Sequence, residues 1–179
     1  MVDTPKSISV GCVDDRVCIR IVGRGTFQNS QPVRQYALEM MERGLHEFVI
    51  DLGQCQALDS TFLGVLAGIG LRLRELGHAS AAHVVNASAR HAELLQTLGL
   101  DRLFDINAGV QGVPDNGHLH PLPDASVVPL TRPLTKDEVA DLILEAHQNL
   151  IRTNKRNAPR FKELLQSIRR REIRQKHKE

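Results

Sequence analysis

Two kinds of apolar pattern alternate along the first part of the chain. Short β-branched runs over 8–13 and 17–25 flank a polar turn at 14–16, which predicts a β-hairpin. Pro32 suits a first helical position and apolar residues follow it at helical spacing, so we expect a helix over 32–43. A continuous apolar run within 46–53 predicts a strand that is buried on both faces and central in its sheet.

The same alternation continues to about residue 110. Helical spacing over 61–76 predicts a helix with one face in the core, carried by Phe62, Leu66, Ile69, Leu73 and Leu76. A strand over 80–88, a helix over 89–99 that Ser88 can cap, and a short strand over 103–106 are expected next. The predicted order is β-β-α-β-α-β-α-β, which indicates a layered α/β domain.

The chain changes character after this domain. Residues 107–134 hold five of the eight prolines and three glycines, which is typical of a linker. We therefore assign 1–110 to the α/β domain, 111–134 to a Pro/Gly-rich linker or surface excursion, and 135–179 to a helical extension with a basic end. Thr135 and Glu138 form a capping box there. An apolar stripe follows it, made of Val139, Leu142, Ile143, Ala146 and Leu150.

Charge is divided unevenly along the chain, although the net charge is only +2. Residues 150–179 hold 11 Lys and Arg against three Glu, whereas the first 149 residues hold 12 basic and 18 acidic residues. A basic tail of this kind is typical of a segment that binds an acidic partner, and it is equally typical of a helix face exposed to solvent. Nucleic-acid binding is disfavoured, because aromatic residues are scarce and the tail contains no base-reading motif.

Other composition features exclude several classes of protein. The three cysteines have no CxxC spacing, so neither a disulfide framework nor a zinc site is indicated, and a reducing cytoplasm is expected. No stretch approaches the roughly 20 apolar residues of a membrane span. No catalytic residue, metal ligand or cofactor site is indicated.

The segment ALDSTFLG, residues 57–64, places an acid and a hydroxyl side by side at a predicted helix start. The side-chain oxygen of Ser60 can accept a backbone N–H there, and the negative charge of Asp59 favours the helix dipole. Capping therefore explains both residues. Gly64 and Gly68, one turn apart on the face opposite the core stripe, leave a low surface for a partner backbone or for packing on a sheet.

Two segments of the chain together resemble a known family. VIDLGQCQALDSTFLGVLAGIGLRLRELG resembles the signature of STAS domains, the fold of bacterial anti-sigma factor antagonists, and GLDRLFDI at 99–106 resembles their usual ending. The resemblance covers about residues 7–108. It implies a STAS-like mixed β-sheet with helices packed against it, to which this chain adds a C-terminal helical extension.

The resemblance also implies a function and a site. In that family the serine after the Asp is phosphorylated by an anti-sigma factor that is itself an ATP-dependent kinase, and a PP2C-type phosphatase removes the phosphate. Carried over, Ser60 is the acceptor, with Thr61 as a second candidate. The implied partner-binding residues are Asp59, Ser60, Thr61, Leu63, Gly64 and Gly68. Phe62 departs from the family, which more often has glycine there. We expect a non-enzymatic, phosphorylation-controlled interaction module in a partner-switching pathway that regulates transcription.

Two other functions stay open. The chain could be a non-phosphorylated STAS subunit of a transport or signalling assembly, docking or dimerising through its C-terminal helices. It could also be a nucleotide-binding STAS domain, although its glycines lack the GKS or GKT of a phosphate-binding loop. A GxSxG nucleophile motif is absent around Ser60, which disfavours hydrolase chemistry.

Overall fold

The structure is a computed structural model, which describes residues 8–107, 109, 113, 119–122 and 134–176. The strands are β1 (Ile8–Val13), β2 (Arg16–Ile21), β3 (Gly23–Gly25), β4 (Glu47–Asp51), β5 (Cys55–Leu58), β6 (Ala82–Val85), β7 (Asp105–Ile106) and β8 (His120–Pro121). The helices are α1 (Phe27–Glu42), α2 (Ser60–Glu75), α3 (Ala89–Leu98), α4 (Lys136–Thr153) and α5 (Ala158–Lys176), with 3₁₀ turns η1 (Leu100–Arg102) and η2 (Lys155–Asn157).

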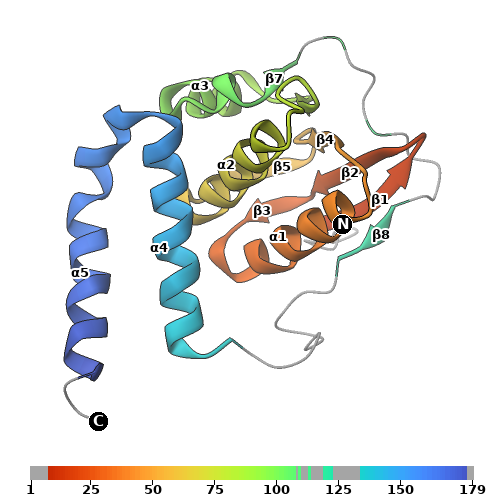
Figure 1. Cartoon of the computed structure of the whole chain (residues 1–179). Helices are drawn as coiled ribbons and strands as arrows, with labels where there is room; N and C mark the ends of the chain where they lie inside the picture. Colours follow the sequence, from red (N-terminus) through yellow and green to blue (C-terminus); the bar gives the residue numbers. More distant parts are fainter. Residues whose placement is uncertain (1–7, 108, 110–112, 114–118, 123–133, 177–179) are drawn as a thin grey trace, which may run out of the picture.

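A mixed sheet forms the centre of the domain (Figure 1). Its strand order is β7-β6-β4-β2-β1-β8, in which β1 runs antiparallel to β2 and β8 while the other neighbours are parallel. Strand β4 lies between β2 and β6, and Phe48, Val49 and Ile50 are all buried. The prediction of a central strand covered on both faces is therefore confirmed, as is the α/β fold class.

The two faces of the sheet are covered differently. Helices α1, α2 and α3 pack on one face and form the main core with Phe48 and Ile50. On the other face Val113 packs in a smaller cluster with Cys18 and Val49. Strand β8 then pairs with β1 at the sheet edge.

Part of the range 111–134, expected to be a linker or a surface excursion, lies against the sheet. Val113 packs on its second face, which is apolar because alternate side chains of a central strand point to opposite faces, and His120 and Pro121 pair with β1. Outside the described residues lie positions 111, 112, 114–118 and 123–133 of that range. Residue 134 is described and precedes α4.

Helix α1 begins five residues earlier than predicted. Its start is stabilised by local polar groups: the side chain of Asn29 accepts from the Thr26 amide at 2.8 Å, and the Ser30 hydroxyl donates to the Phe27 carbonyl at 2.9 Å. Pro32 is therefore inside the helix, where it has no N–H to donate to the Gln28 carbonyl four residues earlier.

The predicted strand over 17–25 is divided into two. Strand β2 ends at Ile21, and Gly23, the first residue of β3, has a φ of 83°, a left-handed conformation that separates the two strands. Strand β3 pairs in parallel with β5 in a separate two-stranded sheet. This small sheet leads directly into the segment that contains Asp59 and Ser60.

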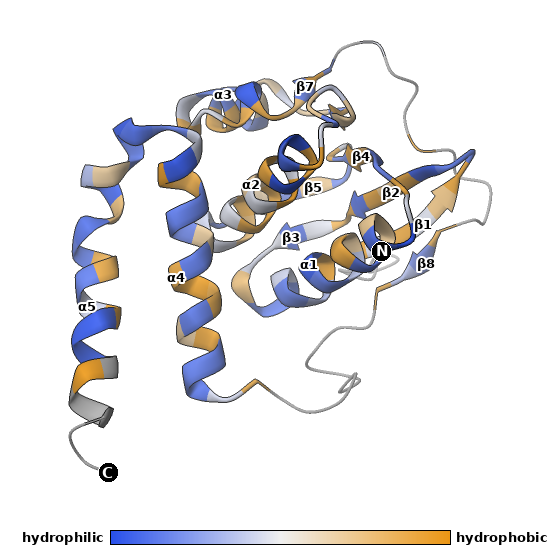
Figure 2. Cartoon of the chain, viewed as in Figure 1, coloured by the Kyte–Doolittle hydropathy of each residue, from blue (hydrophilic) through white to orange (hydrophobic). Residues whose placement is uncertain are grey.

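The C-terminal helices form a further layer. Helix α4 crosses α2, and α5 runs back beside α4 in the opposite direction (Figure 1). The predicted capping box at Thr135 and Glu138 is present, and Leu142, Ala146 and Leu150 from the predicted stripe are buried in the main core. Helix α5 is mostly hydrophilic (Figure 2).

Candidate functional site

Asp59 is the capping residue of α2. Its Oδ1 atom accepts a hydrogen bond from the Phe62 amide at 2.8 Å, which is the usual N-cap contact. Its Oδ2 atom accepts from the amide of Phe27, the first residue of α1, also at 2.8 Å. One carboxylate thus serves the positive ends of two helices. The expectation that Ser60 shares the capping role is wrong, because Ser60 is already the first helical residue.

The hydroxyl of Ser60 contacts α4 instead. Its Oγ atom lies 3.0 Å from Nε2 of His147. The other ring nitrogen, Nδ1, lies 2.7 Å from the carbonyl oxygen of Ile143. Because a carbonyl can only accept, Nδ1 carries the proton, and in the neutral ring Nε2 accepts the hydrogen bond from Ser60. Ser60 is half-buried and His147 is 1% exposed.

The His147 ring is also supported by α5. Phe161 contacts it edge-on, with ring centroids 4.7 Å apart and an interplanar angle of 68°. Aromatic pairs of this geometry are favourable. Helices α2, α4 and α5 therefore meet at one side chain that bonds to Ser60.

The two glycines of α2 lie under α4. A Cβ atom at Gly64 would overlap the carbonyl oxygen of Ala146, and one at Gly68 would lie 2.6 Å from Nδ2 of Asn149. Asn149 in turn donates a long hydrogen bond of 3.4 Å to the Gly64 carbonyl. The glycines thus allow a close approach of helix backbones, and the helix that approaches belongs to this chain.

The partner-binding residues implied by the STAS resemblance differ in burial. Asp59, Ser60 and Gly68 are half-buried, whereas Thr61, Leu63 and Gly64 are buried. Ser60, Gly64 and Gly68 share the face of α2 that α4 covers, and we call these three residues the α2 face. Phe62, the departure from the family pattern, is fully buried in the main core and packs next to Gly25.

One edge of the contact between α4 and the domain is polar. A cavity of about 230 Å³ separates α1, α2 and α4 there. Ion pairs bridge it, Arg34 to Glu145 at 2.9 Å and Arg152 to Glu75 at 2.9 Å. Hydrogen bonds from Arg152 and then Arg72 hold the pKa of Glu75 below its usual value. Exposed pairs of this kind typically stabilise a protein by about 0–1 kcal/mol.

The other end of α4 is fastened by a buried side chain. Asn157, 1% exposed, donates through Nδ2 to the carbonyls of Leu98 at 2.9 Å and Leu150 at 2.8 Å. The Leu98 carbonyl belongs to the last residue of α3, whereas the Leu150 carbonyl also accepts from the Asn154 amide at 3.0 Å, so that Asn157 adds a second bond there. The turn between α4 and α5 is therefore tied to the end of α3.

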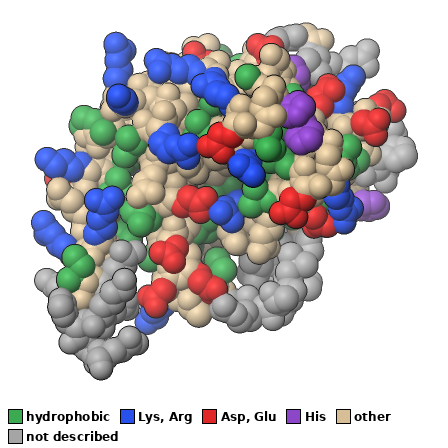
Figure 3. Space-filling view, in the orientation of Figure 1, with side chains coloured by type: hydrophobic (Ala, Val, Ile, Leu, Met, Phe, Trp, Pro, Cys, Tyr) green, Lys and Arg blue, Asp and Glu red, His purple; other side chains and the backbone are tan. Residues whose placement is uncertain are grey.

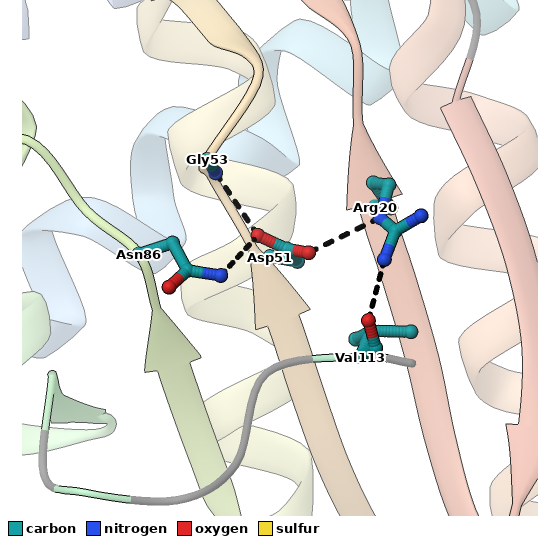
Figure 4. Close-up of polar contacts among 5 residues, drawn as sticks. All are labelled: Arg20, Asp51, Gly53, Asn86 and Val113. Atoms are coloured by element: carbon teal, nitrogen blue, oxygen red, sulfur yellow. Dashed lines mark hydrogen bonds and ion pairs between the residues drawn. The ribbon is translucent and has the colours of Figure 1, made fainter. Parts of the chain in front are cut away.

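A second polar cluster lies at the carboxyl ends of the central strands (Figure 4). Oδ1 of Asp51 accepts from the Gly53 amide at 3.0 Å and from Asn86 at 2.9 Å, and Oδ2 pairs with Nε of Arg20 at 3.1 Å. Arg20 also donates to the Val113 carbonyl. Both carboxylate oxygens are bonded within the protein, so the cluster fixes the loops and the segment at Val113. It was not predicted, although Asp51 and Asn86 both directly follow apolar strand residues.

Sequence reasoning also missed His147. A pattern was available: His147 lies one turn after Ile143 and three residues before Leu150, on the predicted apolar stripe of α4. A polar residue in such a stripe must find a hydrogen-bond partner when it is buried. The identity of that partner, Ser60, depends on how α4 crosses α2 and is not contained in any local pattern.

The comparisons with known proteins agree with this architecture. The family model described as "Mlab, STAS domain" matches residues 8–106. Because this range is more than half of the 179 residues, the chain belongs to the STAS domain family, and the resemblance found in the sequence is confirmed. No curated protein sequence shows significant similarity to the chain.

Two solved structures are similar in fold. One is the crystal structure of TM1081 from Thermotoga maritima, described as a candidate anti-sigma factor antagonist; it is 20% identical, covers 55% of this chain and 84% of its own, and has a TM-score of 0.49. The other is an NMR structure of TM1081, also 20% identical, with coverages of 54% and 77% and a TM-score of 0.49.

The described residues contain neither a metal-binding cluster nor a membrane-spanning helix. No cluster of three or more His, Cys, Asp or Glu side chains there has the arrangement to hold a metal ion. Every helix within the described ranges is too short or too polar to cross a membrane.

Proposed function

We propose that this STAS protein is a phosphorylation-controlled interaction module that acts, like an anti-sigma factor antagonist, in a partner-switching pathway. Ser60 is the phosphate acceptor and Thr61 the second candidate. One observation carries the proposal: Asp59 alone caps α2, so the Ser60 hydroxyl has no capping role and bonds to a side chain of another helix. A serine needed only for the helix start would be expected to bond the backbone there.

A phosphate at Ser60 would change this region strongly. It would add about −1.5 to −2 charges beside the Asp59 carboxylate and three acceptor oxygens at the start of α2. The α2 face would then present a different charge and shape to any partner. Such a change is the physical requirement for a switch between two binding partners.

The proposal assigns no catalytic role to this chain. Ser60 and His147 lie at the distance of a nucleophile and its base, but the second ring nitrogen bonds a backbone carbonyl and α4 covers the pair. In the proposed function Ser60 is instead a substrate of a partner kinase, and a PP2C-type phosphatase removes the phosphate. Three unpaired cysteines fit a reducing cytoplasm as the compartment.

The test is phosphosite mapping on the protein isolated from its native cells, followed by phosphorylation of the purified chain by its cognate kinase with ATP. We expect phosphate on Ser60, with a smaller share on Thr61, and loss of the Ser60 signal in Ser60→Ala. Ser88 is a matched control, because its hydroxyl accepts the His91 amide at 3.2 Å as a true helix cap. Absence of phosphate from both Ser60 and Thr61 would contradict the proposal.

A second candidate function is a non-phosphorylated STAS subunit of a larger assembly. The observation that favours it is the exposed surface of α5, where Leu164 and Ile173 are 39% and 57% exposed. Lys and Arg side chains gather on the same side, at the left of Figure 3. In that case the other subunits would copurify with the chain although it carries no phosphate. The complex would persist in Ser60→Ala and would be lost in Leu164→Asp.

A further inference from the structure

The α2 face is occupied by a helix of the same chain. We propose that α4, supported by α5, is an intramolecular mask over Ser60, Gly64 and Gly68, and that a kinase or binding partner reaches this face only after α4 is displaced. This inference rests on the proposed function and concerns the regulation of the same site. It goes further, because it assigns a role to helices that lie outside the range matched by the STAS family.

The geometry prevents α4 and a partner protein from contacting the α2 face at the same time. The Ala146 carbonyl occupies the position that a Cβ atom at Gly64 would take, and Nε2 of His147 lies 3.0 Å from the Ser60 hydroxyl. A second protein cannot enter between groups already in contact. The apparent affinity of any partner for the α2 face is therefore lowered by the fraction of molecules in which α4 is displaced.

The contact between α4 and the domain combines core packing by Leu142, Ala146 and Leu150 with polar groups. Its centre contains polar side chains, Ser60, His147 and Asn149, next to the apolar ones. One edge is a cavity bridged by exposed ion pairs rather than close packing. Interfaces between parts of a chain that move relative to each other are more polar than continuous cores.

The fastening of α4 also defines how it would move. Asn157 ties the turn after α4 to the end of α3, while the Ser60–His147 bond joins α4 to the start of α2. Residues 134–137, at the opposite end, are exposed. Displacement would therefore swing the whole of α4 about the turn near Asn157, so that its N-terminal end moves farthest and the contacts of Ala146, His147 and Asn149 open with it.

Phosphorylation would hold the mask open. Transfer of the γ-phosphoryl group of ATP forms a P–O bond at Ser60 Oγ, breaks the bond to the β-phosphate, releases ADP and passes the hydroxyl proton to a base of the kinase. The new group cannot fit into a 3.0 Å contact. The volume of the phosphate therefore prevents α4 from closing over the α2 face.

The experiment compares full-length Ala146→Leu with Asp141→Leu. Ala146 is 1% exposed and faces Gly64, so a leucine there must push α4 away, whereas Asp141 is an exposed position of the same helix. Both are combined with Ser60→Cys, and alkylation of the introduced thiol by iodoacetamide is followed by peptide mass spectrometry. We expect at least a tenfold faster alkylation with Ala146→Leu and no change with Asp141→Leu.

Hydrogen exchange of the same proteins shows whether α4 separates alone or the whole domain is destabilised. In Ala146→Leu the amides of α4 should exchange faster while Ile19 and Ile50 in the central strands keep their protection. Unchanged alkylation, or loss of protection in the central strands together with α4, would overturn the inference, since α4 would then be a permanent part of the core. Neither readout needs a kinase or a partner, so this failure is distinct from absence of phosphate on Ser60 in the wild-type protein.

Discussion

The Oδ2 atom of Asp59 accepts a hydrogen bond from the amide of Phe27, 32 residues earlier in the chain. Since Oδ1 of the same carboxylate caps α2, Asp59 joins the starts of the first two helices. Strands β3 and β5 bring these two starts together, because their parallel pairing runs up to Gly25 and Leu58. The STAS motif thus contains a structural acid followed by a serine with a separate role.

The first prediction separates these two roles. Asp59→Ala should lower the free energy of unfolding by roughly 2–4 kcal/mol, because a helix cap and a second charged hydrogen bond are lost. Ser60→Ala should cost about 1 kcal/mol, for one hydrogen bond to His147. Urea unfolding followed by circular dichroism measures both. Hydrogen exchange adds a local readout: the Phe27 and Phe62 amides should exchange faster in Asp59→Ala only, and equal costs for the two variants would restore Ser60 as the cap.

The second prediction concerns the Arg20–Asp51 pair. Both side chains are largely buried, at 13% and 7% exposed, so removal of Arg20 leaves the Asp51 carboxylate with two neutral donors and no charged partner. Arg20→Met should therefore destabilise the protein by about 3–5 kcal/mol. The matched control is Arg16→Met, whose ion pair with Glu47 in the same two strands is exposed and should cost below about 1 kcal/mol. Similar melting temperatures for the two variants would show that the ion pair of Arg20 with Asp51 does not stabilise the domain more than an exposed pair does.

Much of the fold could be predicted because it depends on local patterns. The central strand Phe48–Ile50, the helix over 61–76 and the capping box at Thr135 each rest on residues within one element. The start of α1 was predicted wrongly because it depends on Asp59, which is distant in sequence, and on the side chains of Asn29 and Ser30. Proline prefers the first position of a helix, but these contacts start the helix five residues before Pro32.

The candidate site was only partly accessible to sequence reasoning. A family motif pointed to Asp59 and Ser60, and helical spacing placed Gly64 and Gly68 on one face. Which surface meets that face is a tertiary property, since Ser60 and His147 are 87 positions apart and their contact requires α4 to cross α2. A polar residue on an apolar stripe indicated only that His147 would need some partner.

The third prediction concerns the Cys55 thiol on the strand that leads to Asp59. Burial raises its pKa to about 11. A raised pKa keeps the thiol protonated at neutral pH, and the thiolate is the reactive form. Alkylation of Cys55 should therefore be slow at pH 8 and rise about tenfold per pH unit until the pH nears the pKa. Peptide mass spectrometry after timed iodoacetamide treatment measures it, with the urea-unfolded chain as control; a rate at pH 8 equal to that of the unfolded chain would contradict the assigned pKa.

The last prediction compares two glycines on the same face of α2. Alanine is favoured over glycine in a helix by about 1 kcal/mol, so both substitutions gain the same intrinsic preference. At Gly68 the new methyl group meets Nδ2 of Asn149, the movable end of a side chain, and Gly68→Ala should change stability by less than about 1 kcal/mol.

At Gly64 the methyl group overlaps a backbone carbonyl of α4, which cannot move unless the helix moves. Gly64→Ala should therefore lower the free energy of unfolding by roughly 1–3 kcal/mol despite the better helix former. Circular dichroism during urea unfolding is a suitable probe, since the chain has no Trp. The loss should be concentrated in α4, with faster amide exchange there than in Gly68→Ala. Equal exchange of α4 in both variants would mean that the helices adjust easily at Gly64, and that their close approach does not hold α4 over Ser60.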